Sequence, residues 1–252
     1  MIKKYNGWSL PEKEQHFQQW LYENKVTDYQ YIPYNEVLKL LEKRVVAIDI
    51  GANVGMMTTR YSEVFEEVYS FEPVDLNYEC LQDNVKHLDN VKTYNVALGD
   101  KVQDTFIHNE ANYSNSGGWS INDFTNATWM HYNKKIKLVK ESIHVQLLDN
   151  YKIKPDFIKI DTQNYELQVL KGAENTIKQS LPIIQIEVDK MTVRQVMRHP
   201  ITKYLRKLAY IPLVIVKKDW IYGPVKLYRS EDGSPLKIKY RGPKSLISID
   251  KN

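Results

Sequence analysis

The chain has 252 residues, of which 42% are hydrophobic and 26% charged, and its formal net charge is +4. This composition excludes an intrinsically disordered chain, which combines low hydrophobicity with high net charge. The single cysteine, Cys80, excludes an internal disulfide and a cysteine-based zinc site. No stretch has the run of apolar residues that crosses a bilayer, and the first residues lack the apolar segment of a secretion signal, so we expect a cytoplasmic location.

Residues 1–43 are expected to form an N-terminal helical cap. Ser9 can cap a helix that has Pro11 in its first turn, and the segment after Asn35 repeats apolar residues at helical spacing. No internal repeat or low-complexity block follows. We therefore expect one Rossmann-like domain over residues 44–230 and a basic C-terminal tail over residues 231–252.

From residue 45 onward, short apolar runs alternate with amphipathic segments, which is typical of a parallel, doubly wound α/β sheet. The expected strands are 45–50, 68–72, 93–98, 156–161 and 182–188. The expected helices are 56–67, 75–88 and 166–179. A helix over 192–208, interrupted at Pro200, and an antiparallel hairpin over 212–229 complete the domain.

Residues 109–135 interrupt this alternation with a polar segment rich in Asn, Ser and Gly. A loop of this length in a compact domain is usually functional or disordered. Tyr113, Trp119, Trp129 and Tyr132 favour a function, because aromatic side chains are costly to leave unpacked. We expect this lid insertion to cover a substrate.

A glycine-containing loop follows the first expected strand and includes Gly51, Ala52, Asn53 and Gly55. Glycines at a strand-to-helix junction let the backbone turn tightly and approach a ligand, and the next helix offers free N–H groups. Glu72 ends the following strand, about twenty residues downstream, where an acidic side chain can accept hydrogen bonds from both ribose hydroxyl groups. The loop and the acid together predict a nucleoside-binding site.

The charge of the loop distinguishes between two nucleoside cofactors. Asn53 stands at the middle glycine position of the dinucleotide fingerprint, and Asp49 precedes the loop. A carboxylate repels a pyrophosphate, whereas the amino and sulfonium groups of S-adenosylmethionine (SAM) are cationic. The sequence therefore favours SAM over NAD.

Residues 45 to about 189 resemble the FkbM-type methyltransferases, through the motifs VVAIDIGANVG, SFEP, NVALGD and LLDNY, and through FIKIDTQNYELQVLKGAENTI followed by LPIIQIEV. The resemblance implies a class I methyltransferase fold, with a terminal antiparallel hairpin on a mostly parallel sheet. It also implies a SAM-dependent enzyme that methylates hydroxyl oxygens, commonly on sugars, lipids or polyketide-like small molecules.

The resemblance further implies which residues line the cofactor. They are Asp49, Gly51, Asn53, Gly55 and Glu72, with Ala97 and its neighbours near the adenine; Ala52 and Pro73, which lie within the same motifs, are expected to join them. One departure stands out, because the family pattern Asp-x-Glu-Gly-x-Glu here has Gln163 and Asn164 in place of Glu and Gly. Any role of an acidic side chain at position 163 is therefore lost, or is carried out by an uncharged side chain.

Methylation of a hydroxyl requires a base, or a metal that lowers the hydroxyl pKa. Asp161 is the first candidate, because it ends a central strand at the edge where ligands bind. Glu187 ends the next strand, and Glu166 lies at a helix start, where it can instead stabilise the first turn. His131 in the lid insertion is a further candidate base. The carboxylates lack the spacing of a dedicated metal site, so no metal ligand is predicted and metal dependence stays open.

Two other functions remain open. An RNA ribose 2′-O-methyltransferase is favoured by Asp161 together with Lys190 and Lys43, and by the basic segment 194–207, but the charge excess is small and no RNA-binding module is recognisable. A non-catalytic SAM-binding protein is prompted by Gln163 and Asn164. A small-molecule or glycan hydroxyl is the preferred acceptor, and the sequence does not fix the oligomeric state.

Overall fold

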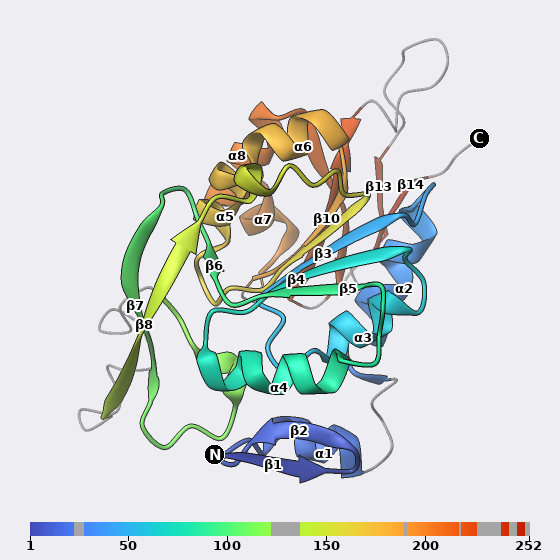
Figure 1. Cartoon of the computed structure of the whole chain (residues 1–252). Coiled ribbons are helices and arrows are strands. Elements are labelled where there is room, and N and C mark those ends of the chain that lie inside the picture. The colour runs from blue at the N-terminus through green and yellow to red at the C-terminus, as the bar shows by residue number, and fades with distance from the viewer. Residues whose placement is uncertain are drawn as a thin grey trace.

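The structure is a computed structural model that describes residues 1–22, 28–121, 137–188, 191–216, 218–225, 238–241 and 246–249, the last two ranges by their backbone alone. A seven-stranded sheet lies at its centre (Figure 1). In spatial order its strands are β11 (Tyr210–Val216), β12 (Asp219–Pro224), β10 (Ile183–Glu187), β9 (Phe157–Ile160), β3 (Val46–Ile50), β4 (Glu67–Phe71) and β5 (Val91–Tyr94). Neighbouring strands from β10 to β5 are parallel, and β12 is antiparallel to both β10 and β11. The predicted doubly wound sheet with a terminal antiparallel hairpin is confirmed.

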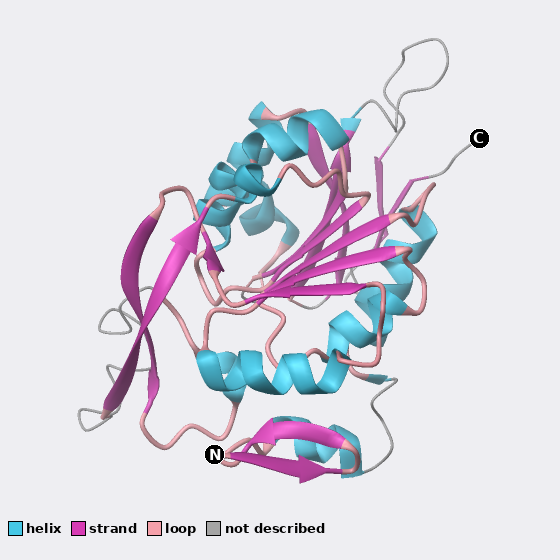
Figure 2. Cartoon of the chain, viewed as in Figure 1, coloured by secondary structure: helices cyan, strands magenta, loops and turns pink. Residues whose placement is uncertain are grey.

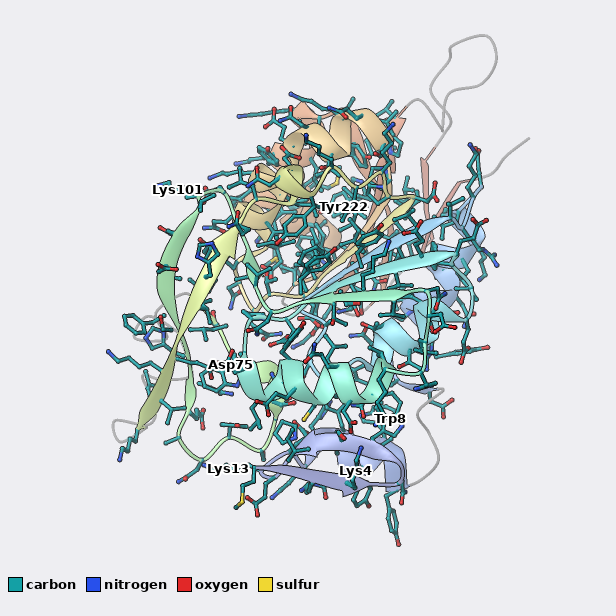
Figure 3. All side chains as sticks on the ribbon, in the orientation of Figure 1. Lys4, Trp8, Lys13, Asp75, Lys101 and Tyr222 are labelled. Carbon is teal, nitrogen blue, oxygen red and sulfur yellow. The ribbon has the colours of Figure 1, made fainter. Side chains whose placement is uncertain are left out.

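Helices cover both faces of the sheet (Figure 2). On one face lie α2 (Tyr31–Leu40), α3 (Met56–Ser62) and α4 (Asp75–Val85); on the other lie α5 (Glu166–Gly172), α6 (Glu174–Ser180), α7 (Val193–Arg198) and α8 (Pro200–Lys207). Alternate strand residues serve the two faces, because side chains alternate along a strand. Ile48, Ile158 and Ile184 pack with α5 to α8, while Ala47 and Phe157 pack with α2 and α3. In Figure 3 the labelled Tyr222, which is fully buried, lies within the dense side-chain layer beneath α5 to α8.

A row of buried polar side chains crosses four strands. In register, Ser70 lies beside Asp49, Asp49 beside Lys159, and Lys159 beside Gln185. Each of the four is at most 3% exposed. Buried polar groups are costly unless they have partners, and Thr58 of α3 supplies one by donating to Asp49 Oδ2 at 2.8 Å. The sheet therefore carries a polar seam that ends below the candidate site.

The N-terminal segment differs from the expected helical cap. Residues 2–11 form a hairpin of β1 (Ile2–Tyr5) and β2 (Trp8–Pro11), so the predicted helix with an Ser9 cap is wrong. Asn6 and Gly7 connect the strands with φ of 47° and 84°, the left-handed conformation that a two-residue hairpin turn requires. The helices of this segment are α1 (His16–Tyr22) and α2, and α2 begins at Tyr31, ahead of the predicted start at Asn35.

The hairpin packs against α4, with Trp8 between the two (Figure 3). Asn84 of α4 accepts a hydrogen bond from the Ser9 N–H at 2.7 Å and donates to the carbonyls of Ser9 and Val54 at 2.9 and 2.8 Å. Cys80 is fully buried in the same cluster, in the packing role its helical position predicts. The Asn84 side chain thus joins the N-terminal hairpin to the loop that follows β3.

A second, three-stranded sheet projects beside the main one (Figure 1). It contains β6 (Ala97–Leu98), β7 (Gln103–Glu110) and β8 (Leu138–Gln146). The strand expected over residues 93–98 is therefore two strands: β5 ends at Tyr94, and β6 pairs instead with β8. The 3-10 turns η2 (Ser116–Gly118) and η5 (Leu148–Tyr151) follow β7 and β8, and a short hairpin of β13 (Ile238–Arg241) and β14 (Leu246–Ile249) lies where a basic tail was expected.

Candidate functional site

A cavity of about 280 Å³ opens at the carboxyl ends of β3, β4, β9 and β10. This edge of the sheet is its topological switch point, because the chain leaves β3 toward β4 on one side and returns through β9 on the other. All but one of the predicted cofactor residues line the cavity: Asp49, Gly51, Ala52, Asn53, Glu72, Pro73 and Ala97. Asp161 and Glu187 line it as well, so the structure brings the two predicted groups together.

The loop after β3 needs glycine at two positions. Gly51 has φ of 79°, and a Cβ there would lie 1.9 Å from the Asp161 carbonyl oxygen. Gly55, with φ of 90°, lies behind the loop at the start of α3, where a Cβ would lie 2.7 Å from Leu81 Cδ1. Asn53 between them is also left-handed, with φ of 50°, which Asn tolerates better than most residues. The loop is therefore pressed against the ends of β9 and α4.

Glu72 follows β4 and is 5% exposed. Its Oε2 accepts a hydrogen bond from the Asn53 N–H at 2.8 Å, and its Oε1 accepts from the Val74 N–H at 3.0 Å and from Asn77 Nδ2 at 3.4 Å. Burial raises the pKa of Glu72 to about 7, although these hydrogen bonds favour the charged form. The carboxyl group is fixed against the loop and titrates near neutral pH.

Lys159 lies between the carboxylates of Asp49 and Asp161. It was not predicted as a site residue from the sequence. Its ammonium nitrogen lies 3.3 Å from Asp161 Oδ2 and 3.7 Å from Asp49 Oδ1. Burial lowers the pKa of Lys159, but Asp161 and Asp49 outweigh burial and hold it well above its usual range. Burial also raises the pKa of Asp49, against the charge of Lys159. The available signal was a lysine inside the otherwise apolar run FIKI, two residues before Asp161 and so on its side of the strand.

Glu187 faces the same part of the cavity as Asp161. The Asp161 carboxylate, followed by burial, raises the pKa of Glu187 to about 8. Gln30 Nε2 lies 3.4 Å from Glu187 Oε2, in hydrogen-bond distance. Tyr29 lines the cavity beside them, and burial followed by the Asp161 charge raises its pKa well above its usual value. Two carboxyl groups that interact with each other therefore lie together at the ends of β9 and β10.

Glu166 has a different position. It is 4% exposed, and its Oε1 accepts hydrogen bonds from the Thr162 and Asn164 N–H groups at 3.2 and 3.0 Å. This geometry assigns it to the turn that starts α5. His131, Trp129, Tyr132 and Lys190 lie outside the described residues.

The cavity has a roof made of residues 14–17 and 29, which sequence reasoning did not place there, and of residues 115–121 from the predicted lid insertion. Ser116 of η2 is 1% exposed, and its hydroxyl donates to Asn53 Oδ1 at 2.9 Å. Its carbonyl accepts from Asn77 Nδ2 at 3.0 Å, and its N–H donates to Glu14 at short distance. Trp119 lines the cavity and packs edge-to-face on Tyr113 with ring centroids 5.8 Å apart. The first part of the lid insertion therefore covers the predicted cofactor loop.

The chemistry of the lining favours a cationic ligand. Four carboxyl groups line it, against two lysines: Asp49, Glu72, Asp161 and Glu187, with Lys159 and Lys218. Asp49 Oδ1, Asn77 Oδ1 and Trp119 Nε1 are buried and have no hydrogen-bond partner among the described residues. Buried polar atoms normally have partners, so these three are suited to ligand atoms. The described residues contain no group of three or more His, Cys, Asp or Glu arranged to hold a metal ion.

The model of the methyltransferase FkbM domain matches residues 49–212, which is more than half of the chain. The chain belongs to the FkbM methyltransferase family. The motifs that the family model spans include the loop after β3, Glu72, Asp161 and Glu187. No curated protein sequence matches this FkbM methyltransferase.

Solved structures similar to this FkbM methyltransferase include methyltransferase FkbM from Methylobacillus flagellatus KT, at 18% identity and a TM-score of 0.48, over 85% of this chain and 55% of that one. This chain therefore spans about half the length of that protein. An rRNA methylase from Streptococcus thermophilus matches at 10% identity and a TM-score of 0.44, over 76% and 92% of the two chains. A protein of Streptococcus mutans in complex with SAH matches at 9% identity and a TM-score of 0.42, over 76% and 94%.

Two further observations concern the surroundings of the site. Among the residues that the structure describes, no helix combines the length and apolar character needed to span a bilayer. Lys43, which the RNA alternative invoked, is exposed just before β3, at the end of the strand opposite to the cavity. The lysine that does approach Asp161 is Lys159.

Proposed function

We propose that this protein is a SAM-dependent O-methyltransferase that acts on a hydroxyl group of a sugar, glycan or other small molecule. The observation that carries the proposal is the juxtaposition, in one cavity, of the nucleoside-type loop with Glu72 and the carboxyl pair Asp161 and Glu187. Membership of a methyltransferase family supports the reaction class. The neighbouring carboxyl groups support an acceptor whose proton must be removed.

The cofactor residues are assigned by chemistry. Glu72 would accept hydrogen bonds from the ribose hydroxyl groups, and Asp49 Oδ1, which lies 3.7 Å from Lys159 Nζ, would accept one from the cationic amino group. Pro73 and Ala97, with the roof residue Trp119, would enclose the adenine. Gly51, Ala52 and Asn53 provide the backbone wall, and Gly55 starts the helix behind it.

SAM supplies an electrophilic methyl group on a positively charged sulfur. The protein's task is then to orient an acceptor hydroxyl and remove its proton. Asp161 is the proposed base, because Lys159 balances its charge without occupying both of its oxygens. Glu187 holds a proton near neutral pH and would orient the acceptor as a hydrogen-bond donor. His131 of the lid insertion stays a proposed alternative base. It lies outside the described residues.

The polar groups of the cavity also bear on the acceptor. A neutral polyhydroxylated molecule would use the carboxyl groups at this edge of the sheet as hydrogen-bond partners. Aromatic rings on the roof, those of Phe17, Tyr29 and Trp119, suit the apolar face of a sugar ring. These features favour a sugar or small-molecule hydroxyl over an RNA ribose. The described part of the lid insertion, residues 109–121, is proposed to cover that acceptor, and the rest of the insertion lies outside the described residues.

Isothermal titration with SAM, S-adenosylhomocysteine and NAD tests the cofactor first. Binding of the two SAM-series ligands but not NAD, weakened in Glu72→Gln and unchanged in Glu67→Gln, is expected; binding of NAD alone overturns the proposal. Transfer of labelled methyl from SAM is then compared between a panel of sugar nucleotides and oligosaccharides and a panel of RNAs. Labelling of RNA alone would establish the rival acceptor, and SAM binding without labelling of either panel would favour a non-catalytic protein.

A further inference from the structure

Both oxygens of Asp161 are held by donors on its own segment of the chain. Gln163 Nε2 donates to Oδ1 at 2.9 Å, and Lys159 Nζ donates to Oδ2 at 3.3 Å. The Asp161 side chain remains 16% exposed, toward the cavity. A carboxylate has about four lone-pair sites, and Glu187 also shares a hydrogen bond with Asp161, so at least one site remains for a ligand.

The amide that holds Oδ1 is itself placed by a constrained turn. Gln163 has φ of 51°, and Asn164 has φ of 77°, so both are left-handed, which is uncommon outside glycine. The Gln163 carbonyl accepts a hydrogen bond from Ser120 Oγ at 2.6 Å, and the Asn164 N–H donates to Glu166 at 3.0 Å. The roof, through Ser120, and the start of α5, through Glu166, therefore fix the position of the Gln163 side chain.

Charged and titratable groups surround Asp161 on every side. Asp49 on β3, Glu187 on β10 and Glu166 on α5 interact with it electrostatically and are like-charged when ionised. Lys159 is the cation in contact, Tyr29 lies beside it, and His16 and Lys218 line the same cavity. Like-charged neighbours favour a neutral, protonated carboxyl, whereas a donated hydrogen bond favours the charged form. The hydrogen bond from the Gln163 amide therefore opposes the effect that the neighbouring carboxyl groups have on Asp161 when they are ionised.

We propose that Gln163 is a positioning residue for Asp161: its amide fixes Oδ1, keeps the carboxylate charged beside Glu187 and Asp49, and leaves the remaining lone pairs for the acceptor hydroxyl. The inference rests on the proposed function, because it assigns Asp161 the role of base. A glutamate at this position would present a carboxylate to Oδ1 instead of a donor. Gln163 thus replaces the acid of the related motif with a neutral group that supports a single charged base.

A binding experiment tests this without knowledge of the acceptor. S-Adenosylhomocysteine is compared with sinefungin, a SAM analogue that carries an amino group in place of the methyl-bearing sulfonium. The ratio of their dissociation constants, measured by calorimetry from pH 5 to 7.5, reports negative charge next to the methyl position. The titration of Glu72 affects both ligands alike and cancels in the ratio. Because the Asp161 charge raises the pKa of Glu187, the comparison is also made in a Glu187→Gln background, where differences between variants are attributable to position 163.

In the wild type we expect a preference for the amino analogue that changes little over this pH range, and in Asp161→Asn no preference at any pH. Gln163→Met has a similar length without the donor, so its preference should match the wild type at pH 7.5 and fall about twofold at pH 5. The shift expected for loss of a hydrogen bond to a charged group is about one pH unit. Gln168→Met, the same change on α5, should behave as the wild type.

Ser120→Ala provides a second variant, because it removes the hydroxyl that holds the Gln163 carbonyl while leaving the amide in place. A smaller shift in the same direction is expected. Retained affinity for S-adenosylhomocysteine serves as the folding control in every variant. A Gln163→Met profile that superimposes on the wild type, or that is lowered equally at all pH values, would overturn the inference. If neither ligand binds the wild type, the proposed function itself has failed.

Discussion

Asn84 and Ser9 exchange two hydrogen bonds, 2.7 and 2.9 Å long, across 75 residues of sequence. A third bond from the same Asn84 amide reaches the Val54 carbonyl in the loop after β3 at 2.8 Å. The N-terminal hairpin and the cofactor loop are therefore anchored by one buried side chain. Phe17 and His16, which follow the hairpin, line the cavity that this loop bounds.

Replacing Asn84 by Ala leaves buried backbone groups of Ser9 and Val54 without partners. At about 1–3 kcal/mol for an unsatisfied buried group, we expect a loss of roughly 2–4 kcal/mol in the free energy of unfolding. Thermal denaturation measures the change, and limited proteolysis reports release of the hairpin. Asn35→Ala, which removes an exposed bond to the Tyr31 carbonyl, is the matched control and should cost less than about 1 kcal/mol. Equal losses in the two variants would contradict the anchoring role.

Gly51→Ala separates backbone strain from steric contact when it is compared with Gly7→Ala. Both residues have φ near 80°, at 79° and 84°, so both variants carry the left-handed penalty of about 1–2 kcal/mol. A Cβ at Gly7 meets no atom within 4 Å, whereas a Cβ at Gly51 would lie 1.9 Å from the Asp161 carbonyl oxygen. In chemical denaturation, we expect Gly51→Ala to lower the free energy of unfolding by roughly 2 kcal/mol or more beyond the loss in Gly7→Ala. We also expect Gly51→Ala to abolish binding of S-adenosylhomocysteine. Similar stabilities would show that the loop and β9 are not in contact.

The affinity for SAM is expected to rise with pH through about 7. Ribose hydroxyl groups donate to the charged form of Glu72, and burial raises the pKa of that group to about 7, so binding requires loss of its proton below this pH. The affinity at pH 6 should be about tenfold lower than at pH 8, with release of close to one proton on binding at the lower pH. Calorimetry in two buffers of different ionisation enthalpy measures that proton. Glu72→Gln should flatten the profile at low affinity, while a steep profile in this variant would assign the titration to another group.

Once an acceptor is found, Asp161→Asn should lower kcat by about 10²–10⁴, the range typical of a general base. Affinity for S-adenosylhomocysteine, whose sulfur is uncharged, should change little. Asp104→Asn, at a side chain 81% exposed and paired with His144, serves as the control with unchanged kcat. Undiminished turnover in Asp161→Asn would remove Asp161 from the mechanism and direct attention to Glu187 or His131.

The strand and helix order of the central sheet was predictable because its strands are short apolar runs between glycines and charged residues. Pro200 marked the break between α7 and α8, and Asp49, Glu72, Asp161 and Glu187 could be placed at strand ends from their positions alone. Each of these signals is local. A strand end determines which edge of the sheet a residue occupies, without knowledge of its distant neighbours.

The roof could not be predicted in the same way. Ser116, Trp119 and Phe17 reach the cavity through contacts between segments about one hundred residues apart, for which a single sequence contains no periodic signal. The helix predicted near the N-terminus was wrong for a different reason. Asn6-Gly7 is a hairpin signal, but the helix-start pattern of Ser9 and Pro11 was given more weight. Lys159 was overlooked because an isolated lysine in a strand usually indicates an exposed position.

The cavity has walls of two origins. Its floor is the backbone of the sheet edge, where the close approach of Gly51 to Asp161 locks the nucleoside loop to the strand that carries the carboxylate. Its roof comes from the N-terminal segment and from residues 115–121, which contact the floor through side chains such as Ser116 and Asn53. Exchanges at Ser116 or Ser120 of the roof are therefore transmitted to the floor, through Asn53 and Gln163 respectively. The floor is built from backbone and the roof from side chains, so the two parts of the cavity are open to sequence change to different degrees.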